Sequence, residues 1–393
     1  MEFSIPTNWD KEFIAGLEKN NLIGNIREVY GKLALDDVGG GRAASSLAFV
    51  TKRTAGQHIK KLKSNGLKFN YLLNALCIDN IEFTREGQNR LRRLMDWLLS
   101  MDIDSVTIAN PYLAMWVRKN YPVFSVSASA NANIDSISKA KFWEGLGVGK
   151  ITFPGIRANR DFDFIRKLRK TIKCKIQLIA NNGCMLNCPD YINHVLMNSH
   201  ASQAWHKRKG YIFDYHIIMC RLRRLEDPLH FIRSDWIRPE DVSFYEELGV
   251  DSIKLVDRRF STKNLLMITQ AYLTRSYSGN LLDLFPTFLG KSFSNHKRWC
   301  LKLFYLLNVT TFMRPFQMLK YSHLLNKIQV SVENKELEGF LRGIPKDCDL
   351  FSCDACGYCG KIAQKTVKSE SGYLLNTISE YKKAVAMLLK GRE

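Results

Sequence analysis

The chain has 393 residues, of which 46% are hydrophobic and 24% charged, as in ordinary globular proteins. No apolar run reaches the roughly 18 residues needed to cross a bilayer, and the first residues lack the pattern of a secretory signal. We therefore expect a cytoplasmic protein without a membrane span. The formal charge of +20 favours anionic partners such as nucleic acid, an acidic protein, a phosphorylated substrate or a membrane surface. Because this charge is spread widely, a solvated basic surface is an equal alternative.

Residues 1–66 contain helical patches and the glycine run Gly39-Gly40-Gly41-Arg42. Successive glycine amides can form an anion-binding nest, to which Arg42 would add a charge. No Lys-Ser/Thr pair follows, as a P-loop requires, so a flexible turn is the preferred interpretation. We expect these residues to form an N-terminal segment packed on the next domain.

From Leu67 onward, short apolar strands alternate with amphipathic helices, which is typical of βαβ units and a parallel sheet. Strands are predicted over residues 67–78, 105–109, 123–127, 150–153, 175–180, 215–219 and 252–256. Helices are predicted over residues 86–99, 112–119, 137–146, 162–171, 239–248, 263–275 and 374–389.

A similar helix-to-strand junction recurs at residues 101–106, 146–151 and 248–253. This weak repetition favours a (β/α)₈ barrel over an open Rossmann sheet, whose phosphate-binding fingerprint is absent. We therefore expect an α/β fold in which a TIM-barrel-like domain covers residues 67–285. Residues 286–393 would form a helical, cysteine-rich C-terminal region.

Basic and aromatic residues interleave over residues 290–345. Such a mixture can bind RNA by stacking and phosphate contacts. A helical layer packed on the barrel with its basic side chains in water is the preferred interpretation, because no RNA-binding motif accompanies it.

Ten cysteines in a cytoplasmic chain indicate metal ligands or redox groups rather than disulfides. Cys184 and Cys188 are separated by three residues where a predicted strand meets a helix. Cys77 and Cys220 follow two other predicted strands, so all four would lie at the carboxyl-end rim of the barrel. Cys174, at the start of its strand, would lie at the opposite rim.

Four thiolates suit either Zn²⁺ or an iron–sulfur cluster. Structural zinc sites usually use two local cysteine pairs, whereas these ligands come from three distant loops, which suits a larger cluster. Cys77 and Cys220 have an alternative interpretation as ordinary buried small residues.

A second cysteine group lies near the C-terminus, and its spacing predicts a metal site. Its Cys-x₂-Cys-x₂-Cys core resembles the local triplet of bacterial ferredoxins, while a structural zinc site is the competing interpretation. The group consists of Cys348, Cys353, Cys356 and Cys359.

A series of motifs runs from about Leu67 to Arg275. They are Phe69–Cys77 with Asn80 and Glu82, Ala109–Leu113, Asn182-Gly183-Cys184-x₃-Cys188-Pro189 with His194 and His200, Ser234–Asp241, Tyr245–Gly249 and Lys254-Leu255-Val256. Their order resembles peptidase family U32, the collagenase-like peptidases. Asp257-Arg258 stands where many relatives have Gly-Arg, and the C-terminal cysteine group is absent from the better-known members.

The resemblance implies a barrel with a [4Fe–4S] cluster held by Cys77, Cys184, Cys188 and Cys220. It also implies oxygen-independent hydroxylation of ubiquinone precursors or of tRNA and rRNA bases, with prephenate as the oxygen source. Older members carry the name protease. This chain has neither His-Glu-x-x-His nor Gly-x-Ser-x-Gly, and cysteines that bind a cluster cannot act as nucleophiles, which makes the peptidase interpretation weaker.

Candidate catalytic residues are His194 and His200 for proton transfer, Arg238 for binding a carboxylate or phosphate, and Glu82. Asn80 and Asn182 are expected at the same cavity. The alternatives are a helix-packing role for the histidines and, for Arg238, a helix-capping network.

The preferred function is an oxygen-independent redox enzyme, hydroxylase-like, that acts on a small molecule or an RNA base. Its cofactors would be a [4Fe–4S] cluster and a second iron–sulfur cluster or zinc at Cys348, Cys353, Cys356 and Cys359. An electron donor such as ferredoxin and a heteromeric partner are also expected. The alternatives are a peptidase, and a non-catalytic RNA- or partner-binding protein with structural metal.

Overall fold

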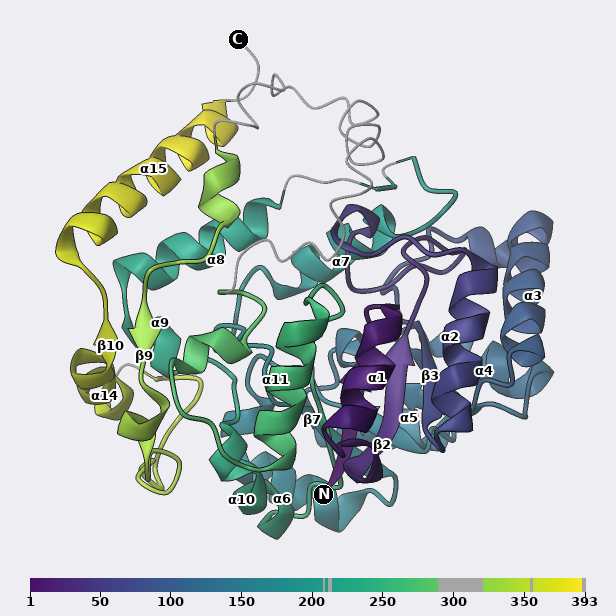
Figure 1. Cartoon of the computed structure of the whole chain (residues 1–393), viewed down its shortest axis with the longest axis horizontal. Helices are drawn as coiled ribbons and strands as arrows, with labels where there is room; N and C mark the ends of the chain where they lie inside the picture. Colours follow the sequence, from purple (N-terminus) through teal and green to yellow (C-terminus); the bar gives the residue numbers. More distant parts are fainter. Residues whose placement is uncertain (208, 211–213, 289–320, 354–355, 391–393) are drawn as a thin grey trace.

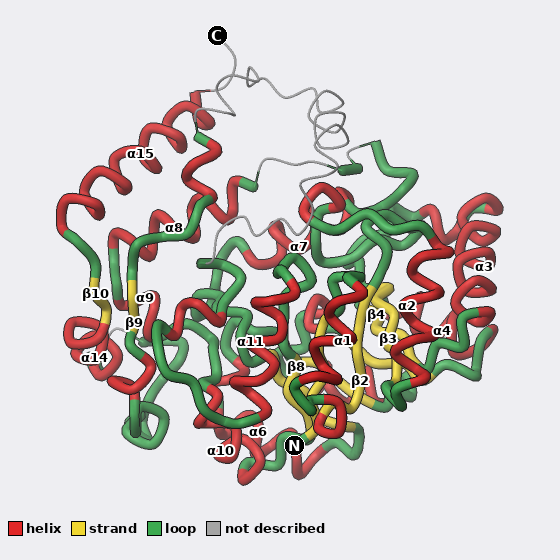
Figure 2. Tube along the Cα trace, viewed as in Figure 1, coloured by secondary structure: helices red, strands yellow, loops and turns green. Residues whose placement is uncertain are grey.

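The computed structural model describes residues 1–207, 209–210, 214–288, 321–353 and 356–390. Eight parallel strands form a closed barrel in chain order, with β1 paired to both β2 and β8. Figure 2 shows these strands enclosed by helices. The strands are β1 Glu2–Pro6, β2 Ile26–Gly31, β3 Lys68–Leu73, β4 Ser105–Ile108, β5 Ser125–Ala128, β6 Lys150–Thr152, β7 Lys175–Ile179 and β8 Ser252–Lys254. The predicted TIM-barrel fold is therefore confirmed.

One helix from each βα unit packs on the outside of the barrel. In α3, the side chains of Leu91, Leu94, Met95 and Leu98 recur at helical spacing and are buried, and Thr84 caps the first turn. The outer helices are α1 Lys11–Lys19, α2 Lys52–Ser64, α3 Arg85–Ser100, α4 Pro111–Asn120, α5 Ile137–Gly145, α6 Phe162–Thr171, α10 Val242–Glu247 and α11 Thr262–Leu273.

The barrel starts at the N-terminus, so the expected boundary at Leu67 is wrong. Residues 1–66 supply β1, α1, β2 and α2, and β1 is the strand that closes the barrel against β8. The short β1 ends at Pro6, and the charged Glu28 of β2 points into the barrel rather than to solvent. Both strands lie before Leu67, where the recognised alternation of strands and helices begins.

The strand predicted at residues 215–219 is wrong, because these residues begin helix α8, Tyr215–Glu226. Asp214 caps this helix by accepting a hydrogen bond from the backbone of Ile217. Ile218, Leu222 and Leu225 are buried at helical spacing. Cys220 therefore lies on a helix and not at the end of a strand.

The segment between β7 and β8 is an insertion that carries α7 Tyr191–Ala201, α8 and α9 Leu229–Ile232 before the barrel resumes at α10. The C-terminal region packs on this insertion, with α15 Ser371–Lys390 against α8 and α14 Tyr358–Thr366 against α9 (Figure 1). Between them, β9 Ser331–Val332 and β10 Val367–Lys368 form a two-stranded sheet.

Short 3₁₀ helices make up the remaining regular structure. They are η1 Ile23–Asn25, η2 Ala44–Ser46, η3 Ile81–Phe83, η4 Ala130–Ala132, η5 Ala158–Arg160, η6 Pro239–Asp241, η7 Leu281–Leu284, η9 Ser322–Leu325 and η10 Asn334–Leu337.

The interior of the barrel is polar. Glu28 of β2 accepts hydrogen bonds from Ser4 at 2.8 Å and from Lys150 at 2.6 Å. Gln177 donates to Ser252 and accepts from Thr152, each at 2.8 Å. The apolar core lies instead between the strands and the outer helices. The barrel interior can therefore contain charged groups below the mouth.

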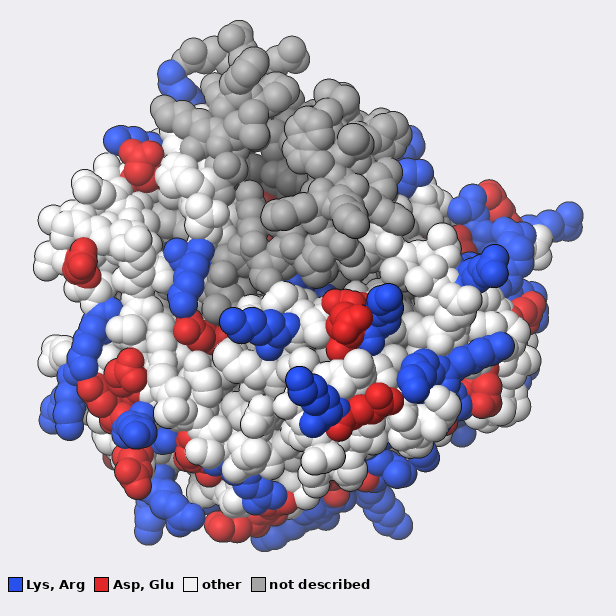
Figure 3. Space-filling model, in the orientation of Figure 1, with Lys and Arg blue, Asp and Glu red and all other residues white. Residues whose placement is uncertain are grey.

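Most of the basic and aromatic stretch predicted at residues 290–345 lies outside the described residues. On the described part of the face in Figure 3, basic and acidic side chains are interspersed. Among the described helices, none has the length and apolar character required to span a bilayer.

Candidate functional site

A cavity of about 470 Å³ lies at the carboxyl ends of the strands. Tyr30, Leu72, Thr152, Ile179 and Lys254 line it from the ends of five strands. This is the mouth at which TIM-barrel enzymes place their reactive groups. Its volume is that of a small-molecule site.

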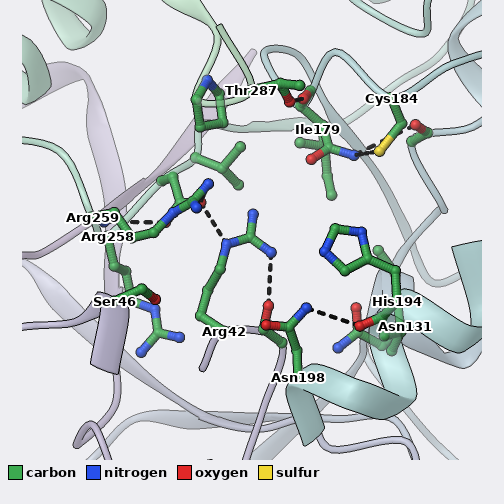
Figure 4. A pocket seen from close by; sticks show the side chains of 18 of the residues that line it. Arg42, Ser46, Asn131, Ile179, Cys184, His194, Asn198, Arg258, Arg259 and Thr287 are labelled. Atoms are coloured by element: carbon green, nitrogen blue, oxygen red, sulfur yellow. Dashed lines mark hydrogen bonds and ion pairs between the residues drawn. The ribbon is translucent and has the colours of Figure 1, made fainter. Parts of the chain in front are cut away.

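Positive charge predominates in the cavity, which five Arg or Lys and two Asp side chains line. Arg42 and Arg259 both pair with Asp257, at 2.5 and 3.0 Å. Burial raises the pKa of Asp257, but the charges of Arg259, Arg42 and Arg258 outweigh it and hold this pKa far below its usual range. Arg258 is buried, and among the described residues its one hydrogen bond is a long one, 3.4 Å, to the carbonyl of Lys32. Figure 4 shows Arg42 in the middle of the cavity, between Arg258 and Arg259 on one side and His194 on the other. The cavity therefore suits an anion.

His194 extends from α7 into the cavity, and its Nε2 lies 3.2 Å from Asp214. A carboxylate at this distance favours the tautomer that carries the proton on Nε2, which leaves Nδ1 able to accept one. On the neighbouring ring, His216 Nδ1 lies 3.2 Å from Asp190. The structure places His194 at the cavity, and its catalytic role stays a prediction.

Cys184, Cys188 and Cys220 lie close together beside the cavity, and Cys184 lines it. Burial, followed by the charges of Cys188 and Cys220, raises the pKa of the Cys184 thiol to about 12. Burial and the charge of Cys220 likewise raise the pKa of Cys188 to about 11. Arg224 Nε donates to the Cys220 sulfur over 3.4 Å. Buried thiols so placed are costly to ionise unless a cation compensates them.

The backbone around Cys184 is held by specific contacts. Gly183 adopts a positive φ of 65°, where a side chain would be strained. Asn182, which also lines the cavity, donates from Nδ2 to the Cys184 sulfur over 3.0 Å. The Arg224 guanidinium donates to the Gly183 carbonyl over 2.6 Å. The turn predicted from Asn182-Gly183-Cys184 is thus fixed from both sides.

Cys77 does not join this group. Its carbonyl accepts a hydrogen bond from Gln203, just beyond the C-terminal end of α7. The Cys188 carbonyl accepts one from Tyr191, the first residue of α7. The 11 residues of α7 separate these ends by roughly 16 Å. The expectation that four thiols meet is therefore wrong for Cys77, because β3 and β7 lie on different sides of the barrel.

The other predicted site residues do not line the cavity. Arg238 is buried and binds the C-terminal region instead, through Asn334 Oδ1 at 2.9 Å and the Leu337 carbonyl. Glu82 is buried in η3. His200 stacks on His206 with ring centroids 4.4 Å apart. Asn80 begins η3 in a left-handed conformation. Of the predicted catalytic residues, only His194 contacts the cavity.

The C-terminal cysteine group lies next to the Cys184–Cys188 turn. Asn187 Nδ2 donates to the Leu350 carbonyl over 2.6 Å, and Arg157 lies over the Phe351 ring at 4.5 Å. Burial raises the pKa of Cys359 to about 11, with Cys353, Cys348 and Cys356 adding to the effect. Among the described residues, no three Cys, His, Asp or Glu are close enough to hold a single metal ion.

Sequence reasoning missed several basic residues of the cavity, among them Lys254 and Arg42. Lys254 was part of a motif without an assigned role, although its place at the end of β8 marks it as inward-facing. Arg42 was set aside with its glycine run, yet it reaches the centre of the cavity. The position of Arg42 could not be inferred without knowing that residues 1–66 belong to the barrel.

Comparison with known proteins finds similarity to one protein family. The model of Peptidase family U32 matches residues 46–186, which include β3 to β7 and Cys184. Residues 46–186 are therefore similar to peptidase family U32. The U32 region is also shared with a curated relative, "Uncharacterized protease MJ1657" of Methanocaldococcus jannaschii, which is 26% identical over 358 residues, covering 88% of this chain and 94% of the relative. A solved structure, "The Structure of the U32 Peptidase Mk0906", is similar with a TM-score of 0.49 and 16% identity, covering 65% of this chain and 92% of that one.

Proposed function

We propose that this U32 protein is an iron–sulfur enzyme that carries out oxygen-independent redox chemistry, hydroxylase-like, on an anionic substrate in the barrel mouth. The observation that carries the proposal is the gathering of Cys184, Cys188 and Cys220 beside a cationic cavity. A small molecule or a single RNA base matches the cavity volume of about 470 Å³.

The donor set fits an iron–sulfur cluster better than a single ion. Iron–sulfur clusters require soft thiolates, and three are near one another here. The ligands of a single metal ion would have to lie closer together than the side chains of the described residues do. Cys184, Cys188 and Cys220 would hold the cluster, and Cys77 is no longer included. A bound cluster would supply one-electron transfer beside the cavity.

The residues of the chain have separate roles in this proposal. Arg42 and Arg258 bind and orient the anionic part of the substrate, since Asp257 neutralises only part of the positive charge. His194 accepts a proton at Nδ1, while Asp214 holds the ring and stabilises its charged form. Leu72 and Ile179 cover the apolar part of the substrate and exclude water.

The second cysteine group supports an electron path to the first. The hydrogen bond from Asn187 to Leu350 attaches the loop after Cys348 to the residue next to Cys188. In this proposal Cys348, Cys353, Cys356 and Cys359 hold a second centre, a cluster or zinc, and a ferredoxin-like donor or a heteromeric partner docks nearby.

A peptidase is the second candidate, favoured by the family description and by the printed name of the relative. A cysteine nucleophile needs a histidine to activate it. Among the described residues, His194 and His216 contact Asp214 and Asp190, and neither forms a hydrogen bond with Cys184 or Cys188. The geometry therefore gives this candidate less support.

Metal analysis of protein purified without oxygen tests the proposal. We expect about four iron and four sulfide at the barrel site, from the composition of a [4Fe–4S] cluster. Cys220→Ser should remove that iron, and Cys77→Ser, the matched control, should leave it. Iron-free protein, or peptide cleavage that survives Cys184→Ser, would overturn the redox proposal.

A further inference from the structure

Lys254 is a buried lysine whose amine is not paired. Its side chain lines the cavity and the residue is 7% exposed. Within the described part of the chain, its Nζ has no hydrogen bond or ion pair and lies 4.1 Å from the centroid of the Tyr30 ring. The other lysines inside the barrel differ, because Lys32 pairs with Asp36 at 2.5 Å and Lys150 with Glu28 at 2.6 Å.

The surroundings of Lys254 favour the neutral amine. Burial lowers its pKa to about 7, and the charges of Lys150 and Arg258 act in the same direction. Glu28 opposes them, but Lys150 and Ser4 already bind its carboxylate. A neutral lysine amine in an apolar site is a nucleophile toward carbonyl carbon.

The shape of the site limits which carbonyl compound can reach Lys254. Its amine lies on the face of Tyr30, which forms an apolar collar at the cavity with four other buried residues, Leu72, Ala130, Ile179 and Val256. Beyond the collar, Arg258 is 94% buried, has no ion pair among the described residues, and also lines the cavity. An aldehyde or ketone with a carboxylate beside it places its carbon on the collar side and its charge toward Arg258.

We propose that Lys254 forms an imine with the carbonyl carbon of an anionic aldehyde or ketone of the 2-oxo acid class. The Nζ lone pair forms the new C–N bond while the carbonyl π pair moves to oxygen, which takes a proton. The nitrogen then loses a proton, the protonated hydroxyl leaves as water, and a C=N bond remains. No electrons are gained or lost overall, so this step needs no external oxidant or reductant and does not depend on the metal centre.

Reductive trapping tests this inference. The protein is incubated at pH 7.5 with pyruvate or glyoxylate and sodium cyanoborohydride, and the modified lysines are mapped by peptide mass spectrometry. At this pH most of the Lys254 amine is neutral, against about one in a thousand for an exposed lysine, so we expect modification at least a hundredfold faster there. Equal labelling of Lys254 and surface lysines would overturn the inference.

Two controls separate the possible causes. Lys254→Arg keeps a long basic side chain but removes the lysine amine, and should abolish the fast adduct. Arg258→Gln should slow trapping of pyruvate about tenfold but not that of neutral propionaldehyde. Mapping in the unmodified chain needs no variant, so a folding defect cannot decide the result. Trapping is repeated in Cys220→Ser, the variant expected to lose the iron. A fast adduct should form there too, because the imine does not depend on the iron–sulfur proposal. A fast adduct that persists in Lys254→Arg would contradict the assignment.

Discussion

The side chain of Asn187 donates a hydrogen bond to the backbone carbonyl of Leu350 over 2.6 Å. This contact spans 163 positions of the chain and links the residue before Cys188 to the loop that follows Cys348. This hydrogen bond therefore connects the loops of two cysteine groups that are far apart in the sequence.

Replacing Asn187 by Ala should weaken this attachment. Loss of one such hydrogen bond costs about 1 kcal/mol of folding free energy. We expect slower reduction of the barrel cluster by dithionite in Asn187→Ala, measured by stopped-flow absorbance. Asn65→Ala, which also removes an amide-to-carbonyl bond, at 3.0 Å, but on the exposed end of α2, is the matched control and should reduce at the normal rate. Equal rates in both variants would remove the support for an electron path through this contact.

Arg238→Ala should destabilise the C-terminal region and leave ligand binding at the cavity intact. The guanidinium binds Asn334 and Leu337 and also lies 3.3 Å from Glu240. Removing a buried cation from such a network costs about 3 kcal/mol. Hydrogen exchange should accelerate in η10, while the exposed control Arg342→Ala should not change it. Weaker substrate binding without faster exchange would restore the predicted substrate-binding role of Arg238.

Lys254→Met should stabilise the protein near neutral pH. The native pKa of Lys254 is about 7 and the unfolded value about 10.4, so between these values the unfolded chain binds the extra proton and native stability rises with pH. The variant lacks this cost, and we expect a gain on the order of 3 kcal/mol at pH 7 that fades toward pH 10.5. Urea unfolding at several pH values measures it. A variant less stable than the parent at pH 7 would show that the amine is charged and paired.

Asp257→Asn should destabilise the protein at neutral pH by about 2–4 kcal/mol, since Arg42 and Arg259 lose their common partner. The native pKa of Asp257 lies below the unfolded value of about 3.9, so its contribution is complete above that value. It is lost as pH falls through the native pKa. The difference between parent and variant should therefore be constant from pH 5 to 8 and shrink below pH 4. A difference that grows at low pH would contradict the pairing.

The strands β3 to β8 were largely predictable, except that the strand placed at residues 215–219 is a helix. Their apolar runs are short and separated by amphipathic helices, as in α6, predicted over the same residues that it occupies, Phe162–Thr171. A run such as Tyr215–Met219 fits a strand and a helix equally, and only the later spacing of Leu222 and Leu225 indicates the helix. β1 and β2 were missed because polar residues such as Glu28 face inward and remove the usual pattern.

The site was predictable where its residues follow each other closely in the chain. Cys184, Cys188 and His194 are near neighbours in sequence, and all three were placed correctly beside the mouth. Cys77 and Arg238 depend on which strands and loops meet across the barrel, which spacing does not encode. Lys254 was missed for another reason, since its significance comes from its buried position on the Tyr30 ring without an ion pair among the described residues.

β7 pairs directly with β8, and this pairing bypasses the whole segment from Ala180 to Asp251. The C-terminal helices pack on that bypassed segment. We therefore expect two cooperative units in one chain: a barrel that unfolds last, and an outer unit of insertion and tail that unfolds first. Folding would then follow the reverse order, so that the barrel forms before the tail packs over the cysteines, and the proposed cluster would be inserted between these two steps.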